Sequence, residues 1–144
     1  MAVASGGGHW VQLLRICKAF DECEVVFVTV HEAYRSQVGR SEFYSVRDAN
    51  RRQPLRLLMT AWQLLGIIRK ERPQVIVSTG AAPGYLALRF ARLIGARTIW
   101  LESIANAEHL SMSGRKIGPY ADLWLTQWPA LARPEGPVYA GSVL

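Results

Sequence analysis

The segment MAVASGGGHW, residues 1–10, decides how the fold of this chain is read. Its first four residues are apolar and predict a short strand, and the apolar spacing that follows predicts a helix over His9–Phe20. Between strand and helix stand four small residues: Ser5, Gly6, Gly7 and Gly8. Glycine lets the backbone turn sharply and approach a ligand, and the helix dipole favours an anion there. The segment predicts a phosphate or diphosphate site with His9 at its edge; the alternative is a glycine turn that only packs helix against strand.

The glycine spacing differs from two common nucleotide-binding loops. The dinucleotide fingerprint has a third glycine three positions after its second. With Gly6 and Gly8 as the first two, that position holds Val11. An acidic residue, Glu32, does follow the second predicted strand, so a dinucleotide site stays open. No lysine followed by serine or threonine comes after the glycines, which argues against a P-loop.

Composition favours one folded domain over residues 1–144. Half of the residues are hydrophobic and 19% are charged, which excludes a disordered chain. The net charge of +6 suits an anionic partner: nucleic acid, an acidic membrane surface or a phosphorylated substrate. Aromatic and basic residues do not interleave as they do in nucleic-acid platforms, so we expect no nucleic-acid partner.

The cysteines and histidines predict neither a disulfide nor a metal site. Cys17 and Cys23 match no zinc or redox spacing and suit the reduced thiols of a cytosolic protein. The three histidines have no ligand spacing among themselves. We therefore expect no metal and no cofactor. The first strand begins at Met1, so we also expect no signal peptide.

Short apolar runs alternate with helical patterns along the chain. The predicted later strands are Val25–Val30, Phe43–Val46 near an edge, Val75–Thr79, Thr98–Leu101, Leu123–Thr126 and a last short one within residues 136–144. The predicted later helices are Glu32–Val38, Pro54–Arg72 and Pro83–Ile94. Apolar runs without polar alternation are typical of strands buried on both faces. The pattern predicts an α/β fold with a Rossmann-like, doubly wound parallel sheet.

The ends of the predicted strands carry the other candidate site residues. In doubly wound sheets, ligands bind at the carboxyl ends of the strands, around the point where strand order reverses. A second small-residue loop, Ser78–Gly84, contains Thr79, Gly80 and Gly84 and opens a helix. Glu102 and Ser103 follow the next strand. The sequence therefore predicts two anion-binding loops and one carboxylate at the same edge.

The segment Leu55–Ile68 is apolar almost all the way round its predicted helix. It is shorter than the roughly 20 apolar residues that span a bilayer. Basic residues flank it on both sides: Arg47, Arg51 and Arg52 before, Arg69, Lys70 and Arg72 after. Either the helix is buried under a partner element, or one surface dips into an anionic membrane interface.

These residues together resemble the acceptor-side subunits of two-protein glycosyltransferases, which include the bacterial polysaccharide proteins PssD and EpsE and the eukaryotic membrane-anchoring Alg subunit. The matching segments are Ser5–His9, Val77–Gly80, Leu101–Ser103, and Leu110–Lys116 running into Tyr120–Pro129. The resemblance covers nearly the whole chain and implies one half of a GT-B fold, similar to the N-terminal domain of MurG.

The resemblance also implies an activity and its partners. A separate donor-binding subunit would hold a UDP-sugar, and this chain would be inactive alone. The implied transfer is inverting and metal-independent, onto a polyprenyl-diphosphate-linked sugar acceptor in polysaccharide or oligosaccharide biosynthesis. The chain would be cytoplasmic and peripheral on the cytoplasmic face of an anionic membrane.

Site residues carry over by matching the quoted motifs. Ser5 and the three glycines of the first loop would hold the acceptor diphosphate. His9 would either deprotonate the acceptor hydroxyl or hydrogen-bond a phosphate. Thr79, Gly80 and Gly84 would form the second loop. Glu102, beside Ser103, would hold the acceptor sugar or act as an alternative base.

Two features depart from the family pattern. Many members have an N-terminal apolar anchor, whereas here the first strand begins at Met1. The loop after Gly80 reads Ala-Ala-Pro-Gly84, which is less glycine-rich than the family's version. Two other functions stay open: a stand-alone Rossmann-like domain that binds a nucleotide or dinucleotide, and a non-enzymatic membrane scaffold that only localises its partner.

Overall fold

Seven parallel strands form one sheet at the centre of the molecule. The computed structural model describes residues 1–50 and 52–143, so that Arg51 and Leu144 lie outside the described residues. The strands are β1 Ala2–Val3, β2 Phe27–Thr29, β3 Phe43–Ser45, β4 Val75–Ser78, β5 Arg97–Leu101, β6 Leu123–Thr126 and β7 Val138–Tyr139. Their order is β3-β2-β1-β4-β5-β6-β7. The predicted Rossmann-like doubly wound parallel sheet is confirmed, with β3 at an edge as expected.

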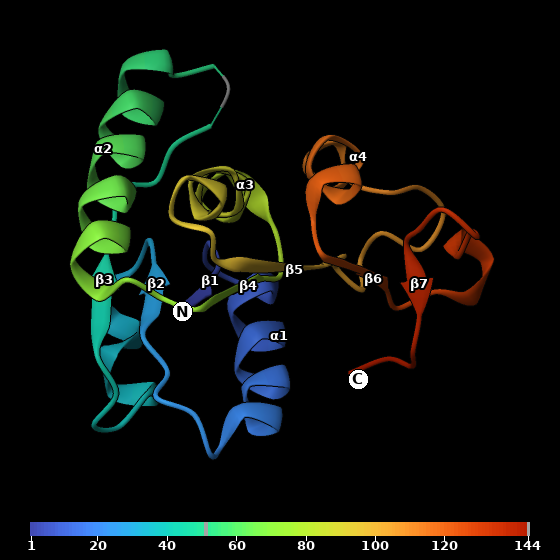
Figure 1. The fold of residues 1–144 in the computed structure, drawn as a ribbon, viewed down its shortest axis with the longest axis horizontal. Coiled ribbons are helices and arrows are strands. Elements are labelled where there is room, and N and C mark those ends of the chain that lie inside the picture. Colours follow the sequence, from blue (N-terminus) through green and yellow to red (C-terminus); the bar gives the residue numbers. More distant parts are fainter. Residues whose placement is uncertain (51, 144) are drawn as a thin grey trace.

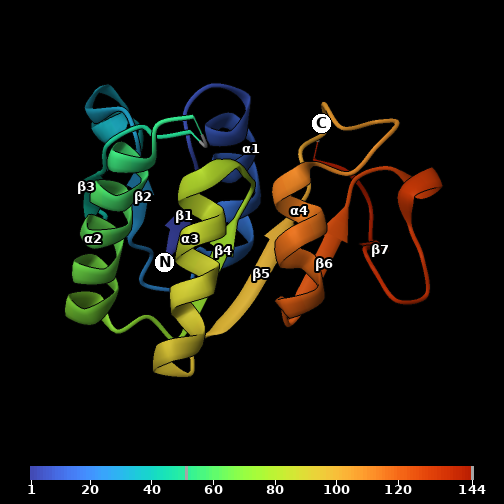
Figure 2. The same cartoon turned by 90° about the horizontal axis from the view of Figure 1, so that it is seen from above.

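Helices cover both faces of the sheet. The α-helices are α1 Gly8–Cys17, α2 Pro54–Glu71, α3 Ala81–Ala91 and α4 Met112–Ile117. The 3₁₀ helices are η1 Lys18–Phe20, η2 Glu32–Gln37, η3 Arg92–Ile94, η4 Gly118–Tyr120 and η5 Pro129–Leu131. Figure 1 shows α2, α3 and α4 side by side on one face, with α1 on the other. Seen from above, α2, α3 and α4 again lie side by side in this order, on one face of the sheet (Figure 2).

Two helix predictions differ from the structure in detail, and one short helix was not predicted. The predicted helix over Glu32–Val38 is the 3₁₀ helix η2, and α3 begins at Ala81, before the proline expected to open it. The short helix α4 was not predicted, because its sequence MSGRKI has no apolar periodicity. It forms because Ser111 caps it: the Ser111 hydroxyl accepts a hydrogen bond from the Gly114 N–H at 2.8 Å.

The core has two layers because successive strand residues point to opposite faces. Val3, Val28 and Ile76 face α2 and α3, where they pack with residues such as Leu64, Ile68 and Leu88. Ala2, Phe27 and Val77 face the other way and pack with Trp10 and Leu13 of α1. Both faces of the central strands are covered, which explains why their sequences lack polar alternation.

The apolar helix α2 is buried on one face only. Thr60, Leu64 and Ile68 are fully buried against the sheet and α3. On the opposite face, Leu55 is 76% exposed and Trp62 is 66% exposed. The first predicted alternative, burial under a partner element, therefore holds for the face of α2 that packs on the sheet and α3. The opposite face of α2 is exposed.

Candidate functional site

The order in which the chain adds strands to the sheet reverses between β1 and β4. The chain runs from β1 outward to β2 and β3, then returns to β4 on the other side of β1. The two small-residue loops follow these two neighbouring strands, since Ser5–Gly7 follow β1 and Thr79–Gly80 follow β4. The predicted meeting of the two loops at the switch point of the sheet is what the structure shows.

A pair of hydrogen bonds locks the two loops together. The His9 Nδ1 lies 2.8 Å from the Thr79 carbonyl oxygen, and the Thr79 hydroxyl donates to the His9 carbonyl oxygen at 2.7 Å. A carbonyl oxygen can only accept, so Nδ1 carries the hydrogen and the Nε2 of a neutral ring keeps a free lone pair. The fold thus fixes both the position and the tautomer of His9.

Gly80 lies directly beneath the His9 ring. Its φ of 137° and ψ of −174° belong to a region that only glycine populates readily. A Cβ at this position would stand 2.5 Å from His9 Cε1 and 2.6 Å from Nδ1. The second loop therefore needs glycine for both its backbone shape and the approach of the histidine.

The first loop is partly covered by residues that follow β2. The His31 ring packs so closely on Gly6 that a Cβ there would collide with it. The Gly7 N–H donates to the Tyr34 hydroxyl at 3.1 Å, so this N–H already has a partner. Gly8 is exposed and opens α1. Of the three glycines, Gly8 is thus the most open to a ligand.

A pocket of about 470 Å³ lies in front of the switch point. We call it the carboxyl-edge pocket, and its lining comes from five parts of the chain: Ser5, Gly6, Val30, His31, Asp48, Ala49, Asn50, Ala81, Ala82 and Ser113. Ala81 has a φ of 63°, a left-handed conformation uncommon for a residue with a Cβ. The volume of the carboxyl-edge pocket is within the usual range for small-molecule sites, about 300–1,000 Å³.

The N-termini of two helices point toward this edge. Neither α1 nor α3 has a side-chain cap, so their first-turn N–H groups are not bonded to a capping side chain. No acidic residue stands in the first turn of either helix. Uncapped N–H groups and the positive ends of the helix dipoles attract an anion. The predicted preference for an anion thus has a physical basis at both loops.

Glu102 is buried rather than open to the pocket. Only 1% of it is exposed, and its carboxylate accepts hydrogen bonds from the Trp100 indole, the Asn106 amide, and the Ser111 N–H and hydroxyl. In this conformation the carboxylate holds together the loop between β5 and α4. Contact with an acceptor sugar, as predicted, would first require that loop to open.

Of the predicted site residues only Ser5 and Gly6 line the pocket, and Gly84 and Ser103 lie apart from the two loops as well. Gly84 is buried inside α3, where a Cβ would collide with the Ser78 side chain. It allows α3 to pack closely on β4, and it does not line the carboxyl-edge pocket as its predicted role would suggest. Ser103 forms the turn after Glu102, where its carbonyl oxygen accepts from the Asn106 N–H at 3.0 Å.

Sequence reasoning missed several residues of the pocket, among them His31, Asp48 and Asn50. His31 directly follows the predicted strand Val25–Val30, so the rule that selected Glu102 could have selected it too. Asp48 and Asn50 follow β3 in the same way. In residues 1–50 and 52–143 no three His, Cys, Asp or Glu side chains cluster as metal ligands would.

Solved structures agree with the fold. The MurG structure of Acinetobacter baumannii superposes with a TM-score of 0.78 at 15% identity, over 98% of this chain and 46% of that one. The fold is therefore a Rossmann-like half of the GT-B type, as expected. The chain belongs to the family described as "Oligosaccharide biosynthesis protein Alg14 like", which matches residues 1–143.

Curated relatives agree with this family. The UDP-N-acetylglucosamine transferase subunit ALG14 of Yarrowia lipolytica is 40% identical over 72 residues, covering 46% of this chain and 33% of the relative. The Homo sapiens protein of the same name is 23% identical and covers 100% of this chain and 82% of its own length. The resemblance to the Alg subunits is confirmed.

Proposed function

We propose that this chain is the acceptor-binding subunit of a UDP-sugar-dependent glycosyltransferase that extends a polyprenyl-diphosphate-linked sugar. The observation that carries the proposal is the pair of locked loops at the switch point, beside a pocket lined in part by Ser5, Gly6, Ala81 and Ala82. Relatives named as UDP-N-acetylglucosamine transferase subunits support N-acetylglucosamine as the transferred sugar.

The diphosphate of the acceptor would lie at the N-termini of α1 and α3. Each helix end contributes about half a positive charge together with unpaired N–H groups. Gly8 is exposed at the first of these ends. The carboxyl-edge pocket would then hold the first sugar, with Asp48 and Asn50 offering acceptors and donors to its hydroxyl groups.

His9 is the proposed contact to the reacting end of the acceptor. In the transfer, the acceptor hydroxyl oxygen bonds to the anomeric carbon, the bond from that carbon to UDP breaks, and the hydroxyl proton leaves to a base. The Nε2 of His9 carries the free lone pair for that proton, or donates to a phosphate when the ring is protonated. Inversion and independence from metal are part of this proposal. Glu102 would act only through the loop that its hydrogen-bonded carboxylate holds together.

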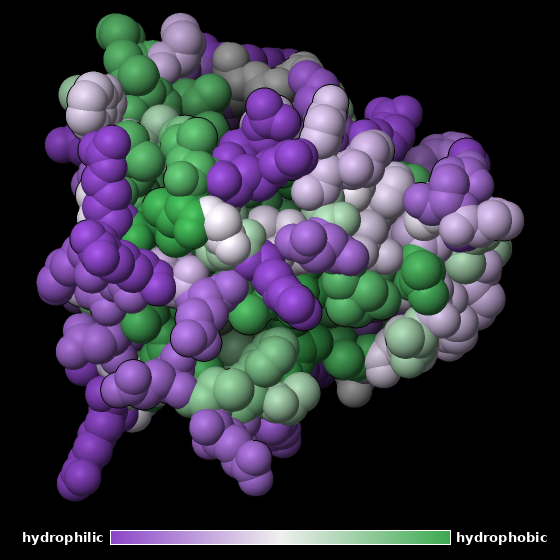
Figure 3. Space-filling view, in the orientation of Figure 1, coloured by the Kyte–Doolittle hydropathy of each residue, from purple (hydrophilic) through white to green (hydrophobic). Residues whose placement is uncertain are grey.

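The exposed face of α2 is the proposed membrane contact. Leu55, Leu58, Met59 and Trp62 are 76%, 56%, 49% and 66% exposed and stand at the spacing of one helical face. Figure 3 shows apolar side chains gathered over the upper part of α2, with hydrophilic residues around them. Arg52 and Arg56 are exposed nearby and suit anionic lipid headgroups. No helix among the described residues is long and apolar enough to cross a bilayer.

A separate donor-binding subunit completes the proposed enzyme. The chain covers 46% of the MurG structure to which it is similar, and the curated relatives are named as subunits. We propose that the partner holds the UDP-sugar over the carboxyl-edge pocket. The proposed location is therefore peripheral, on the cytoplasmic face of the membrane.

The test is sugar transfer from radiolabelled UDP-N-acetylglucosamine to membrane lipid, with this chain alone, a candidate partner alone, and both. We expect sugar transfer only when this chain and the partner are both present. His9→Gln retains a donor toward Thr79 but no base, so a loss of about 10²–10⁴-fold identifies His9 as the base. His109→Ala, at an exposed histidine, is the matched control. Full activity of the complex with His9→Ala would instead support a scaffold that only localises its partner. Tight UDP-sugar binding by this chain alone would support a stand-alone nucleotide-binding domain.

The membrane contact has its own test. Burying a half-exposed leucine or tryptophan contributes about 1–1.5 kcal/mol, so Leu58→Ser with Trp62→Ser should weaken binding to anionic vesicles about 100-fold. Leu93→Ser is the control, since Leu93 is 72% exposed on η3 at the other edge of the sheet. Equal losses in both variants would exclude α2 as the membrane contact.

A further inference from the structure

A second hollow lies at the opposite edge of the sheet, where the strands begin. It has a volume of about 970 Å³ and lies between the turn that follows α2 and the turn that precedes β5. We call it the amino-edge hollow; its lining includes Arg69, Arg72, Val75, Ile94, Gly95 and Arg97. None of its lining residues is a carboxylate. It is separate from the site of the proposed function and does not depend on it.

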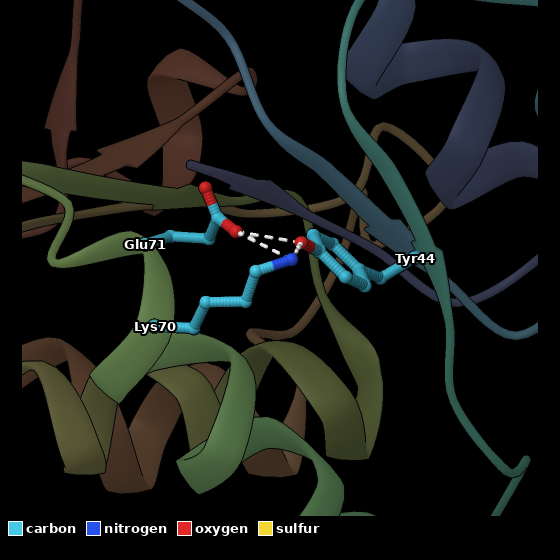
Figure 4. A network of polar contacts seen from close by, with 3 residues as sticks. All are labelled: Tyr44, Lys70 and Glu71. Carbon is cyan, nitrogen blue, oxygen red and sulfur yellow. Dashed lines mark hydrogen bonds and ion pairs between the residues drawn. The ribbon is translucent and has the colours of Figure 1, made fainter.

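Two carboxylates beside the hollow, Glu71 and Asp122, already have hydrogen-bond partners. The Tyr44 hydroxyl donates to Glu71 at 2.6 Å, and Lys70 donates to the same hydroxyl at 2.6 Å (Figure 4). Lys70 also lies 3.6 Å from Glu71. Asp122 accepts from the Thr98 N–H and hydroxyl at 2.6 and 2.8 Å.

None of the three guanidinium groups forms an ion pair within residues 1–50 and 52–143, although Arg97 also interacts electrostatically with Asp122. Among the described residues the only ion pair is Lys70–Glu71. The backbone N–H groups of Arg72, Gly95 and Arg97 donate to other carbonyl oxygens. Arg69 suits the negative end of the α2 dipole. The helix dipole does not explain the charge of Arg97, because this residue stands at the start of β5.

Arg72 adds an independent observation from the backbone. It ends α2 in a left-handed conformation, with φ 44° and ψ 53°. Glycine is the usual residue at such a helix end, because a side chain costs conformational energy there. An arginine at a position suited to glycine, with its side chain lining a basic hollow, points to a role for that side chain.

We propose that the amino-edge hollow binds a soluble anion that carries more than one phosphate charge, of the class of the nucleoside diphosphates. Arg69, Arg72 and Arg97 would pair with the phosphates, since guanidinium groups bind phosphate oxygens in a bidentate manner. Val75 and Ile94, 37% and 39% exposed, offer an apolar surface for the organic part. The hollow has the volume of a small-molecule site.

The test is an NMR titration of the ¹⁵N-labelled 144-residue chain with pyrophosphate, ADP and UDP, and separately with anionic vesicles. We expect the soluble ligands to shift the amide signals of residues 69–75 and 94–97. Arg97→Gln and Arg72→Gly should each weaken binding about tenfold, the effect of one charge-assisted contact. Arg115→Gln, which removes an exposed charge on α4, should leave the affinity within about twofold.

Arg72→Gly also separates binding from folding. Because glycine suits the left-handed conformation, this variant should unfold at the same or a higher temperature while it binds less tightly. The proposal is overturned if all variants bind alike, if the shifts appear only at the carboxyl-edge pocket, or if only vesicles shift the signals of the hollow. None of these outcomes involves sugar transfer, so they leave the proposed function untouched.

Discussion

Gly80→Ala is the sharpest test of the lock between the two loops. The substitution adds a Cβ 2.5 Å from His9 Cε1, at a residue whose φ is 137°. A residue with a Cβ in this region costs about 1–3 kcal/mol. Displacing the His9 ring would also break its bond to the Thr79 carbonyl oxygen, which contributes about 0.5–1.5 kcal/mol. We expect a total loss of about 2–4 kcal/mol in the free energy of unfolding.

The assay is urea unfolding followed by circular dichroism, with Gly66→Ala as the matched control. Gly66 lies exposed inside α2 with open space around its would-be Cβ, so alanine should stabilise the protein by about 0.5–1 kcal/mol. In a His9→Ala background the clash disappears and only the backbone cost remains, so the loss from Gly80→Ala should shrink by about 1 kcal/mol. A loss below about 0.5 kcal/mol for Gly80→Ala, or no change in the His9→Ala background, would refute the lock.

Three further predictions concern single side chains. Glu102→Gln replaces an acceptor with a donor among groups that all donate, so it should lower the free energy of unfolding by about 1–3 kcal/mol; an unchanged urea midpoint would contradict this network. Burial raises the pKa of the Cys17 thiol to about 11, so at pH 8 a thiol reagent should label only the exposed Cys23 quickly and label both after unfolding. Hydrogen bonds from the Thr98 side chain, and then from its backbone, lower the pKa of Asp122. These bonds therefore stabilise the fold above the ordinary pKa of an aspartate, and this stabilisation is lost as the pH falls below about 4. Asp122→Asn should lose this part of the acid sensitivity in thermal melts, and identical pH profiles would contradict it.

The sequence predicted the sheet well because its signals are local. Runs such as Val25–Val30 and Val75–Thr79 are apolar without alternation, which marks strands covered on both faces. The strand-end rule also predicts that Ser5, Thr79 and Gly80 lie at one edge of the sheet. Two strands came out shorter than predicted, because β2 pairs over residues 27–29 and β4 over residues 75–78, whereas β5 begins one residue earlier than predicted.

The contacts that shape the site are not local and could not be read from the sequence. The bond between His9 and Thr79 joins residues 70 positions apart and exists because β1 and β4 are neighbours. Glu102 follows a strand as a ligand-facing residue would, yet the path of the loop to Ser111 turns its carboxylate inward. A strand end fixes the edge at which a side chain lies but not whether the next loop covers it.

The position of α2 connects the proposed membrane contact to the proposed acceptor site. This helix joins the end of β3 to the start of β4, so it runs against the strands and begins at the edge that carries the pocket. Asn50 lines the pocket, and the exposed apolar face starts at Leu55, only five residues later. From Leu55 to Trp62 that face extends about 10 Å. With this face in a bilayer, a lipid-linked diphosphate could reach the glycine loops without leaving the membrane, while the amino-edge hollow would face the solvent.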